Sequence, residues 1–334
     1  MKILFLLVLI ISLVYGEKTL KIATYNVENL FDLQHSGHEY KEYIPYTKSN
    51  WNDVNYKKKL KNIAKVIKDI DADIIGLQEI ESLQALKDLR YTLKRNGVYY
   101  QYYKIANLKK TTIKVAILSK IPFIYTHEIA VKFSYRYRNI LEAKFRIDNE
   151  DLYILVNHWK SKAGPESMRI VSAKKLRKRI QELGRNKNII ALGDFNSDYE
   201  EYKIFKRKRR HNDTDGITGI NHILGTIKYQ DKPQNIKVAS DDFYNLWYDT
   251  EMEKRYSYIY RGKKEAMDSI LVTAALLNKK GIDYKLHSIT AFEKPYLFKR
   301  KSIYRWQTTR SRLRRHKGKG YSDHLPVIAK FVLH

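Results

Sequence analysis

The amino-acid sequence predicts an α/β fold in which two packed β-sheets carry helices on their outer faces. Apolar, strand-like runs recur along most of the 334 residues, and two amphipathic helical patterns stand between them. Many strands with few helices favour packed sheets with the helices outside. Because no Pro/Gly/Ser-rich linker and no internal repeat interrupts the pattern, we expect a single domain over residues 17–334.

Each expected element has its own pattern. Leu20–Val27 alternates like a strand, and Asn55–Ile70 has apolar residues at helical spacing with lysines on the other face. Asp71–Ile80 follows as a buried strand, and a second helix is expected over Glu166–Leu183. Further strands are expected over Thr112–Ser119, Ile140–Ile147, Leu152–Asn157, Asn188–Leu192, Met267–Val272 and Leu325–Val332.

The first residues are typical of a secretory signal peptide. Lys2 gives a positive start, Ile3–Val14 form a 12-residue apolar run, and small residues precede a cleavage point after Gly16. A run of this length is short for a bilayer span, so we expect removal of residues 1–16 and no stable membrane insertion afterwards. A short membrane anchor is the alternative. The chain has no cysteine, so the mature protein, expected to be secreted or periplasmic, folds without disulfides.

The chain is strongly basic, with 64 Lys and Arg against 36 Asp and Glu and a formal net charge of +28. Folding does not need such an excess, which usually indicates an anionic partner, either nucleic acid or an acidic surface. A genome that favours lysine codons is the alternative source, but it explains clustered arginine less well.

Two stretches concentrate the positive charge. Phe205–His211 holds five Lys and Arg, and Lys294–Lys319, called the basic segment below, holds eleven with no acidic residue. Aromatic residues alternate with these cations, which fits phosphate contacts combined with base stacking. We therefore expect nucleic acid to bind here, with a disordered loop or contact with lipid headgroups as alternatives. The aromatic residues are Tyr296, Phe298, Tyr304 and Trp306.

Polar side chains recur at the ends of the expected strands. Asp194 and Asn196 would project together if the extended backbone continues past Gly193, because residues i and i+2 share a face of a strand. Turn chemistry that closes a strand is the alternative. Carboxylates and carboxamides are hard oxygen ligands that suit Mg²⁺, Mn²⁺ or Ca²⁺ better than zinc. The other polar residues at strand ends are Asn26, Glu79, His158, Asp268, Asp323 and His324.

Six motifs in order carry a resemblance to a known family: TYNVENL, GLQEIE, LVNHWKSK, GDFNSD, MDSILV and YSDHLP. Together they resemble the endonuclease/exonuclease/phosphatase superfamily, to which pancreatic deoxyribonuclease and the exonuclease-III-like abasic endonucleases belong. NHWKSK, followed by Arg169 on a helix, is similar to the secreted bacterial nuclease branch. The resemblance implies a four-layer α/β/β/α sandwich with two packed mixed β-sheets flanked by helices, and metal-dependent hydrolysis of a phosphate ester at one edge of the sheets.

The resemblance also implies roles for the matching residues on the metal side. Glu79 corresponds to the principal metal ligand, with Asn26 and Asp323 beside it. The metal is expected to be Mg²⁺, with Mn²⁺ or Ca²⁺ as alternatives. Asp194 corresponds to the group that positions or deprotonates the attacking water, and Asn196 to the group that holds the phosphate or that aspartate.

Histidines and an arginine complete the implied site. His324 resembles the second catalytic histidine, oriented by Asp268, and His158 resembles the first, acting on the phosphate or the leaving oxygen. His158 has no clear acidic partner in the sequence. Arg138 stands where nucleases of this family place a phosphate-binding arginine, although Arg136 is only two residues away.

The expected function is a secreted or periplasmic nuclease. We expect a monomer that cuts DNA, with RNA as a second candidate, to 5′-phosphate and 3′-hydroxyl ends. A carboxylate partner raises the pKa of a histidine and favours its imidazolium form. The sequence therefore does not decide which of Asp194 and His324 is the general base. The alternatives are a phosphoesterase for lipid headgroups (sphingomyelinase-like) or inositol phosphates, and a catalytically inactive nucleic-acid-binding module.

Overall fold

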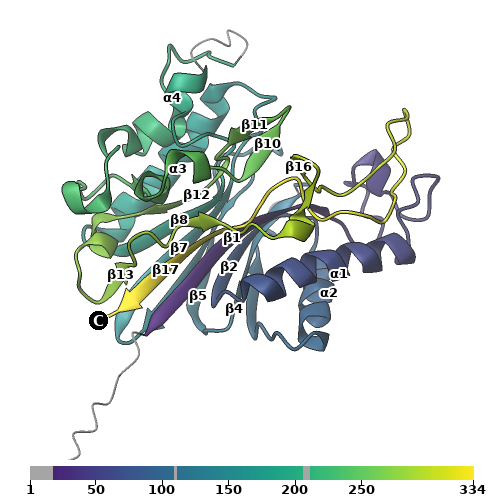
Figure 1. The fold of residues 1–334 in the computed structure, drawn as a ribbon, viewed down its shortest axis with the longest axis horizontal. Coiled ribbons are helices and arrows are strands. Elements are labelled where there is room, and N and C mark those ends of the chain that lie inside the picture. The colour runs from purple at the N-terminus through teal and green to yellow at the C-terminus, as the bar shows by residue number, and fades with distance from the viewer. Residues whose placement is uncertain (1–17, 109–110, 206–210) are drawn as a thin grey trace, which may run out of the picture.

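The structure is a computed structural model that describes residues 18–108, 111–205 and 211–334 (Figure 1). Within these ranges two mixed β-sheets pack face to face with the longer helices outside, so the predicted α/β sandwich is confirmed. The expected signal peptide, residues 1–16, and most of the basic run 205–211 lie outside the described residues. None of the helices in the described ranges is both long enough and apolar enough to cross a membrane.

The β1 sheet mixes parallel and antiparallel pairs. Its strands, in spatial order, are β13 (Ile282–Tyr284), β17 (Val327–Leu333), β1 (Thr19–Leu30), β2 (Ile74–Ile80), β4 (Lys114–Ser119) and β3 (Tyr102–Ile105), and β14 (Thr290–Ala291) also pairs with β17. β1 is parallel to β2 and antiparallel to β17, so the first and last described strands are neighbours.

The β8 sheet is likewise mixed. Its strands, in spatial order, are β5 (Phe123–Ile129), β6 (Ile140–Ile147), β7 (Glu150–His158), β8 (Asn188–Asp194), β12 (Asp268–Val272) and β9 (Tyr244–Asn245). β7 and β8 are parallel, and β12 is antiparallel to β8. The carboxyl ends of β7 and β8 therefore meet the amino end of β12 at one edge of the sheet.

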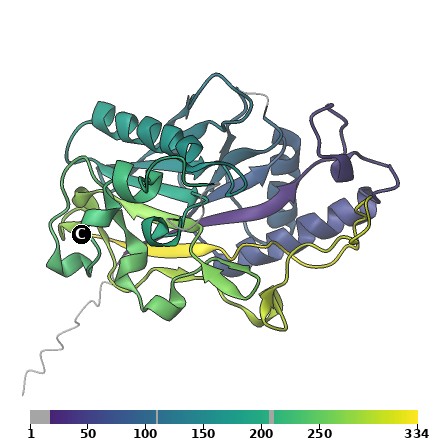
Figure 2. The ribbon, with the colours of Figure 1, turned by 90° about the horizontal axis from the view of Figure 1, so that it is seen from above.

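Helices cover the outer face of each sheet. α1 (Asp53–Ile70) and α2 (Leu83–Arg95) lie on the β1 sheet, and α3 (Glu166–Leu183) packs on the β8 sheet through a second apolar cluster (Figure 2). Smaller elements connect these layers: α4 (Glu201–Ile204), the hairpins β10–β11 (Tyr258–Tyr260, Lys263–Glu265) and β15–β16 (Phe298–Lys299, Ser302–Ile303), and single helical turns at Lys41–Tyr43, Gly219–Ile223, Thr226–Lys228, Pro233–Asn235, Leu246–Asp249, Met252–Lys254, Ala274–Leu277 and Pro295–Leu297.

The expected elements are found with small shifts at their ends, and α2 is an element that the sequence analysis missed. Its sequence carries two signals for a helix: Ser82 caps the first turn by accepting a hydrogen bond from the backbone N–H of Ala85, and leucines follow at helical spacing. β2 begins at Ile74, later than expected, because α1 ends at Ile70 and Asp71 adopts the left-handed conformation (φ +49°) that closes the helix.

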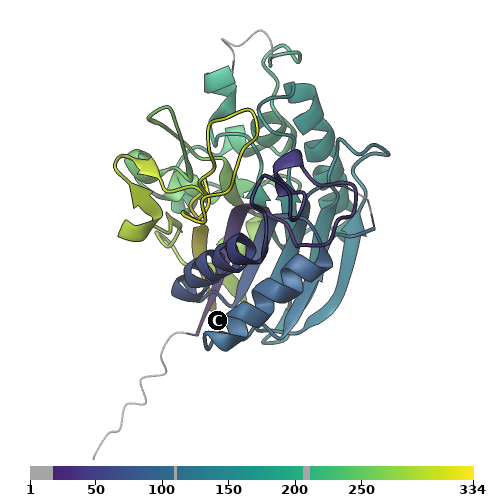
Figure 3. The ribbon, with the colours of Figure 1, turned by 90° about the vertical axis from the view of Figure 1, so that its right-hand side faces the viewer.

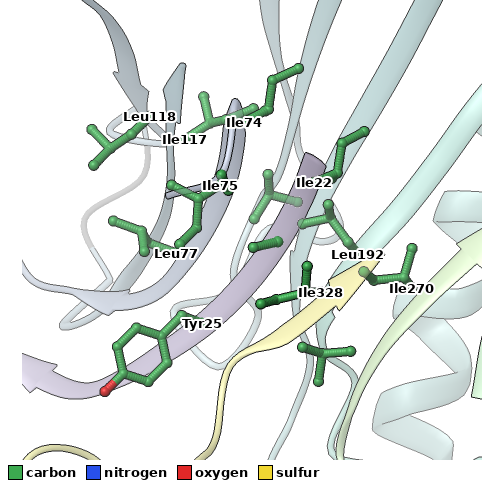
Figure 4. Close-up of a cluster of buried hydrophobic side chains, with 14 of the residues drawn as sticks. Ile22, Tyr25, Ile74, Ile75, Leu77, Ile117, Leu118, Leu192, Ile270 and Ile328 are labelled. Carbon is green, nitrogen blue, oxygen red and sulfur yellow. The ribbon is translucent and has the colours of Figure 1, made fainter. Parts of the chain in front are cut away.

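Apolar side chains of both sheets, Ile75, Leu192 and Ile270 among them, form the core between the sheets (Figure 4). Gly76 of β2 faces Leu192 of β8 so closely that a Cβ at Gly76 would clash with the leucine. Because alternate residues share a face of a strand, Asp194 lies on the same inner face as Leu192. His158 on β7 and Asp268 on β12 are on this face as well, paired in register with Asp194. The alternation that builds the core thus continues into the site.

Gly193 is required where β8 passes β7. Its φ is +139°, and an added Cβ would collide with the backbone of Asn157. We expect Gly193→Ala to lower the free energy of unfolding by more than about 3 kcal/mol, since backbone strain and a backbone clash add. Gly97 is the matched control, with φ +82° and no atom within 4 Å of an added Cβ. Gly97→Ala should cost only about 1 kcal/mol. Urea unfolding checks both, and equal losses would contradict the close approach.

Candidate active site

A histidine and two aspartates lie side by side at the edge of the β8 sheet. The strand register pairs His158 with Asp194, and Asp194 with Asp268, and all three are buried. Asn26 reaches them from β1, donating from Nδ2 to Asp194 Oδ2 (3.0 Å) and to Glu79 Oε1 (3.2 Å). Asn26, predicted as a metal ligand, thus orients two carboxylates and ties the two sheets together at this edge.

Irregularities in β1 and β2 turn Glu79 into the site. The register of β2 shifts between Gln78 and Ile80, and Glu79 between them has a left-handed backbone with φ +67°. In a regular strand Glu79 would face the helices, on the side opposite Gln78. The bulge turns the Glu79 side chain to the other face of the strand, toward the site. There the backbone N–H of Asn29 donates to Glu79 Oε2 (2.9 Å), and Asn29 lies in an irregular part of β1.

Asp194 is fixed by its neighbours on both oxygens. Asn26 donates to Oδ2, and the backbone N–H of Asn196 donates to Oδ1 (2.8 Å). β8 ends at Asp194 and Asn196 has φ +47°, so of the two alternatives the turn chemistry places Asn196. Burial raises the pKa of Asp194 to about 7; His324 opposes this shift, and nearby carboxylates add to it.

His324 and Asp268 form a buried pair. His324 Nδ1 lies 2.6 Å from Asp268 Oδ2, and the Ser257 hydroxyl donates to the same oxygen (2.6 Å). Burial alone would lower the pKa of His324, but the charge of Asp268, its hydrogen bond and the charge of Asp194 outweigh burial and raise that pKa well above its ordinary value. His324 is therefore cationic at neutral pH. Ser257 stands in no motif, so only the fold reveals its contact.

His158 has the opposite electrostatics. Its Nε2 lies 3.5 Å from Asp194 Oδ2 and 3.8 Å from Glu79 Oε1. Burial, followed by the charges of Arg138 and His324, lowers the pKa of His158 well below its ordinary value. The structure thus gives His158 the acidic neighbours that the sequence did not reveal, whereas its Nδ1 has no hydrogen-bond partner in the described part of the chain. His158 is therefore neutral and can exchange hydrogen bonds without adding charge.

Asp323 meets a cation from the basic segment. One guanidinium nitrogen of Arg305 lies 3.2 Å from Asp323 Oδ2, and Nε donates to Glu28 Oε1 (2.8 Å). Burial raises the pKa of Glu28 to about 7, and Asp323 adds to this shift although Arg305 opposes it. Sequence reasoning missed Glu28 and Arg305. The motif TYNVENL contains Glu28, but the bulge that turns its side chain to this place has no signal in a single sequence.

The basic segment is anchored to the protein (Figure 3). Trp306 has only 3% of its surface exposed and lies against Trp51, and its Nε1 donates to His316 Nδ1 (2.8 Å). His316 Nε2 lies 2.9 Å from the carbonyl oxygen of Glu42. The expectation that Trp306 stacks on bases is therefore wrong, because packing hides its ring. Tyr296, Phe298 and Tyr304 keep partly exposed side chains.

Of the two candidate arginines, the structure brings Arg138 to the site. Arg138 donates to the carbonyl oxygen of Trp159 (3.1 Å), and Asn196 Nδ2 donates to the same oxygen (3.2 Å). The backbone N–H of Trp159 in turn donates to the carbonyl oxygen of Asp194 (2.9 Å). Arg136 makes none of these contacts.

One cluster in the described ranges has the spacing of metal ligands. Ligand atoms of Asp194, Asp268 and His324 lie within 4.8 Å of one another. Asp268 and His324 already form a hydrogen bond, however, and His324 carries a positive charge that opposes a second cation. This trio by itself therefore does not make a complete metal site.

The side chains around Glu79 fit a hard divalent cation better. Burial, and next the charge of Asp323, raise the pKa of Glu79, as expected for carboxylates that face each other without a cation. Asn29 Oδ1 is buried and has no hydrogen-bond partner in the described ranges. Carboxylate and amide oxygens are the ligands that Mg²⁺, Mn²⁺ and Ca²⁺ prefer, so the residues present fit such an ion.

A divalent cation bound at Glu79 should raise the Tm of the protein. A cation that binds only the folded protein stabilises it by about 2.7 kcal/mol at a hundredfold excess over its Kd. We expect Mg²⁺ to raise Tm relative to EDTA, and Glu79→Gln to abolish the rise. Glu81→Gln is the matched control. Glu81 is also a buried carboxylate, just beyond the end of β2, but it accepts a hydrogen bond from the backbone N–H of Asp32. A Mg²⁺ shift that survives Glu79→Gln would contradict this site.

The buried side chain of His316 should make the free energy of unfolding depend on pH. Burial lowers its pKa to about 4, so between pH 6.5 and 4 the unfolded chain binds the proton and the folded chain does not. Stability is therefore lost as pH falls through this range. From pH 7.5 to 5.0 we expect the wild type to lose about 2 kcal/mol more than His316→Gln, which cannot titrate. Urea unfolding at the two pH values checks this, and parallel losses would contradict it.

The chain was compared with known families and proteins. The model of the Endonuclease/Exonuclease/phosphatase family matches residues 21–230 and 222–332. No curated protein sequence matches at the threshold applied. Among solved structures, TDP2 of D. rerio complexed with a single-strand DNA product is similar with a TM-score of 0.58 at 13% identity, covering 94% of this chain and 99% of that one.

Two structures from Bacteroides thetaiotaomicron are also similar. An endonuclease/exonuclease/phosphatase family protein has a TM-score of 0.57 at 15% identity, covering 96% of this chain and 100% of its own. A mannosyl-6-phosphatase has a TM-score of 0.56 at 15% identity, covering 94% and 100%. At these identities the structures support the fold, while the family match spans nearly the whole described chain. The protein therefore belongs to the endonuclease/exonuclease/phosphatase family, whose members hydrolyse phosphoester bonds and generally depend on a divalent metal.

Proposed function

We propose that the protein is a metal-dependent nuclease that hydrolyses phosphodiester bonds of DNA, with RNA as a second candidate, to 5′-phosphate and 3′-hydroxyl ends. The observation that carries the proposal is the buried row in which Asp194 lies between neutral His158 and the ionised His324–Asp268 pair. This row offers a base and a cation to one phosphodiester. The formal charge of +28 favours a polyanion over a small phosphate.

Glu79 and Asp323 would hold the metal, with Asn26 orienting Glu79 through its hydrogen bond. A bound divalent cation supplies positive charge at the phosphate oxygens and lowers the pKa of a water. Without a cation, the two carboxylates repel an anionic substrate. Arg305 offsets part of this repulsion at Asp323.

Asp194 is the proposed general base. A pKa near 7 lets its carboxylate take a proton from water at neutral pH and release it again afterwards. Hydrogen bonds from Asn26 and Asn196 fix both of its oxygens. His324 is less suited to this role because its raised pKa keeps it protonated. As a cation it would bind the phosphate oxygen on which charge accumulates.

Three further groups would position the phosphate. Neutral His158 can donate a hydrogen bond beside Asp194, while Asn196 and Arg138 are held together at the carbonyl of Trp159. A guanidinium suits a phosphate because its planar donors can bind two oxygens at once. The nucleophile and the phosphate would then approach Asp194 from one side.

The proposed setting is outside the cytoplasm. We infer that the mature chain acts as a monomer after loss of residues 1–16, which a composition without cysteine permits. Nucleic acid as partner is supported by the basic composition and by the similar TDP2 structure, which was crystallised with a single-strand DNA product.

Plasmid cleavage tests the function. With Mg²⁺ we expect nicking that EDTA stops and that His324→Ala slows about a hundred- to ten-thousandfold, the usual contribution of a positioned acid or base. His287→Ala is the matched control, because His287 also pairs with a buried aspartate, Asp249 (3.2 Å), but takes no part in the site. The control should cut at the wild-type rate.

Other outcomes would assign the protein elsewhere. Equal nicking by His324→Ala would contradict the assigned site. Hydrolysis of sphingomyelin vesicles or inositol phosphates without nicking would establish a lipid or small-phosphate phosphoesterase. Binding of DNA without any hydrolysis would leave an inactive nucleic-acid-binding module.

A further inference from the structure

We propose that the β5–β6 loop, residues 130–139, forms a base-binding surface for single-stranded nucleic acid next to the catalytic residues. The proposal rests on the nuclease function above. An open hollow of about 600 Å³ lies between this loop and the start of α3. Tyr135 and Tyr137 line it from the loop, and Pro165 and Met168 line it from the helix.

Aromatic side chains on this loop are open to solvent. Phe133 is fully exposed and Tyr135 is 75% exposed. Single exposed apolar residues are common, but here two exposed rings lie two residues apart on one loop, and Tyr135 also lines the hollow. Ring faces that no protein atom covers can stack on bases of any sequence.

Cationic side chains lie beside the same surface. Arg136, Arg138 and Lys160 form no ion pair with a carboxylate in the described part of the chain. Burial lowers the pKa of Lys160, and the charges of Arg138 and Arg136 lower it further. Cations beside exposed rings complement a chain of phosphates and bases.

The loop is connected to the catalytic residues through its last turn. Arg138 shares the carbonyl oxygen of Trp159 with Asn196, and Trp159 is bonded to Asp194. Tyr135 is three residues from Arg138, so their Cα atoms are at most about 11 Å apart. A strand whose phosphate contacts Arg138 can therefore place a neighbouring base on the loop.

The chemistry favours a single strand over the other candidate, a membrane. A ring can stack on a base only where the base is not already stacked in a duplex. Membrane-binding segments present a continuous apolar face, whereas Ser134 and Arg136 interrupt the rings here. The basic segment is the less suitable stacking surface, because Trp306 is buried and Arg305 is bound to Glu28.

The test separates stacking from charge. Binding of a labelled twelve-nucleotide oligothymidylate, and of an abasic phosphodiester chain of the same length, is measured in EDTA by fluorescence anisotropy. We expect the double variant Phe133→Ala, Tyr135→Ala to bind the oligothymidylate about ten- to a hundredfold more weakly and the abasic chain as the wild type does. Tyr91→Ala is the matched control, since Tyr91 is an exposed ring (62%) beside Arg95 on α2. It should leave both affinities unchanged.

Several results would overturn the proposal. One is that the double variant loses affinity equally for both ligands, and another is that it loses affinity for neither. The third is that Tyr91→Ala loses as much affinity for the oligothymidylate as the double variant does. Sedimentation of the wild type, but not the double variant, with phosphatidylserine vesicles would assign the loop to a membrane. Wild-type hydrolysis of bis(p-nitrophenyl) phosphate with Mg²⁺ is recorded separately. Its absence would contradict the nuclease function, while the binding comparison would still decide the role of the loop.

Discussion

The structure of the site depends on one electrostatic constraint: five carboxylates, those of Glu28, Glu79, Asp194, Asp268 and Asp323, lie buried or half-buried at one edge of the sandwich. Carboxylates that share a region of low dielectric raise one another's pKa values, and leaving them ionised without partners costs free energy. Each therefore has a compensating group, and these groups come from distant parts of the chain. They are His324 for Asp268, Arg305 for Glu28 and Asp323, and Asn26 for Glu79 and Asp194.

A buried lysine extends this compensation to the helical layer. Lys59 of α1 is fully buried, and its Nζ donates to the carbonyl oxygen of Tyr321, two residues before Asp323. Burial lowers the pKa of Lys59 to about 8, although Glu28 and Asp323 oppose this shift. Even so, burial and the charge of Asp323 keep the pKa of Glu79 raised, so its ionised form has a free-energy cost that a bound cation would offset. In a phosphoester hydrolase a cation held there would lie where the substrate binds.

The basic segment divides its charges between structure and surface. Arg305 binds Glu28, and Trp306 packs against the aromatic cluster of Trp51 and His316. This anchoring fixes the backbone that leads into Asp323 and His324. Arginines further along the segment stay exposed and can attract a polyanion. A long basic segment thus helps to hold two site residues as well as to supply positive charge.

The sequence by itself determined the fold class, most of the long strands and helices, and the residues that end the strands. Apolar alternation and helical periodicity are local properties, and the six ordered motifs identify Asp194, Asp268 and His324 without coordinates. α2 was within reach, because its cap at Ser82 and its leucine spacing are local too.

Only the tertiary structure decided how these residues meet. The bulge at Glu79 reverses the face that the alternation predicts, and it forms because β1 and β2 pair with shifted register. The contact of Arg305 with Glu28 joins residues 277 positions apart, and the burial of Trp306 depends on Trp51. Such contacts arise from the packing of distant elements, and pKa values follow from burial and neighbouring charge. A pattern along the chain therefore cannot specify them.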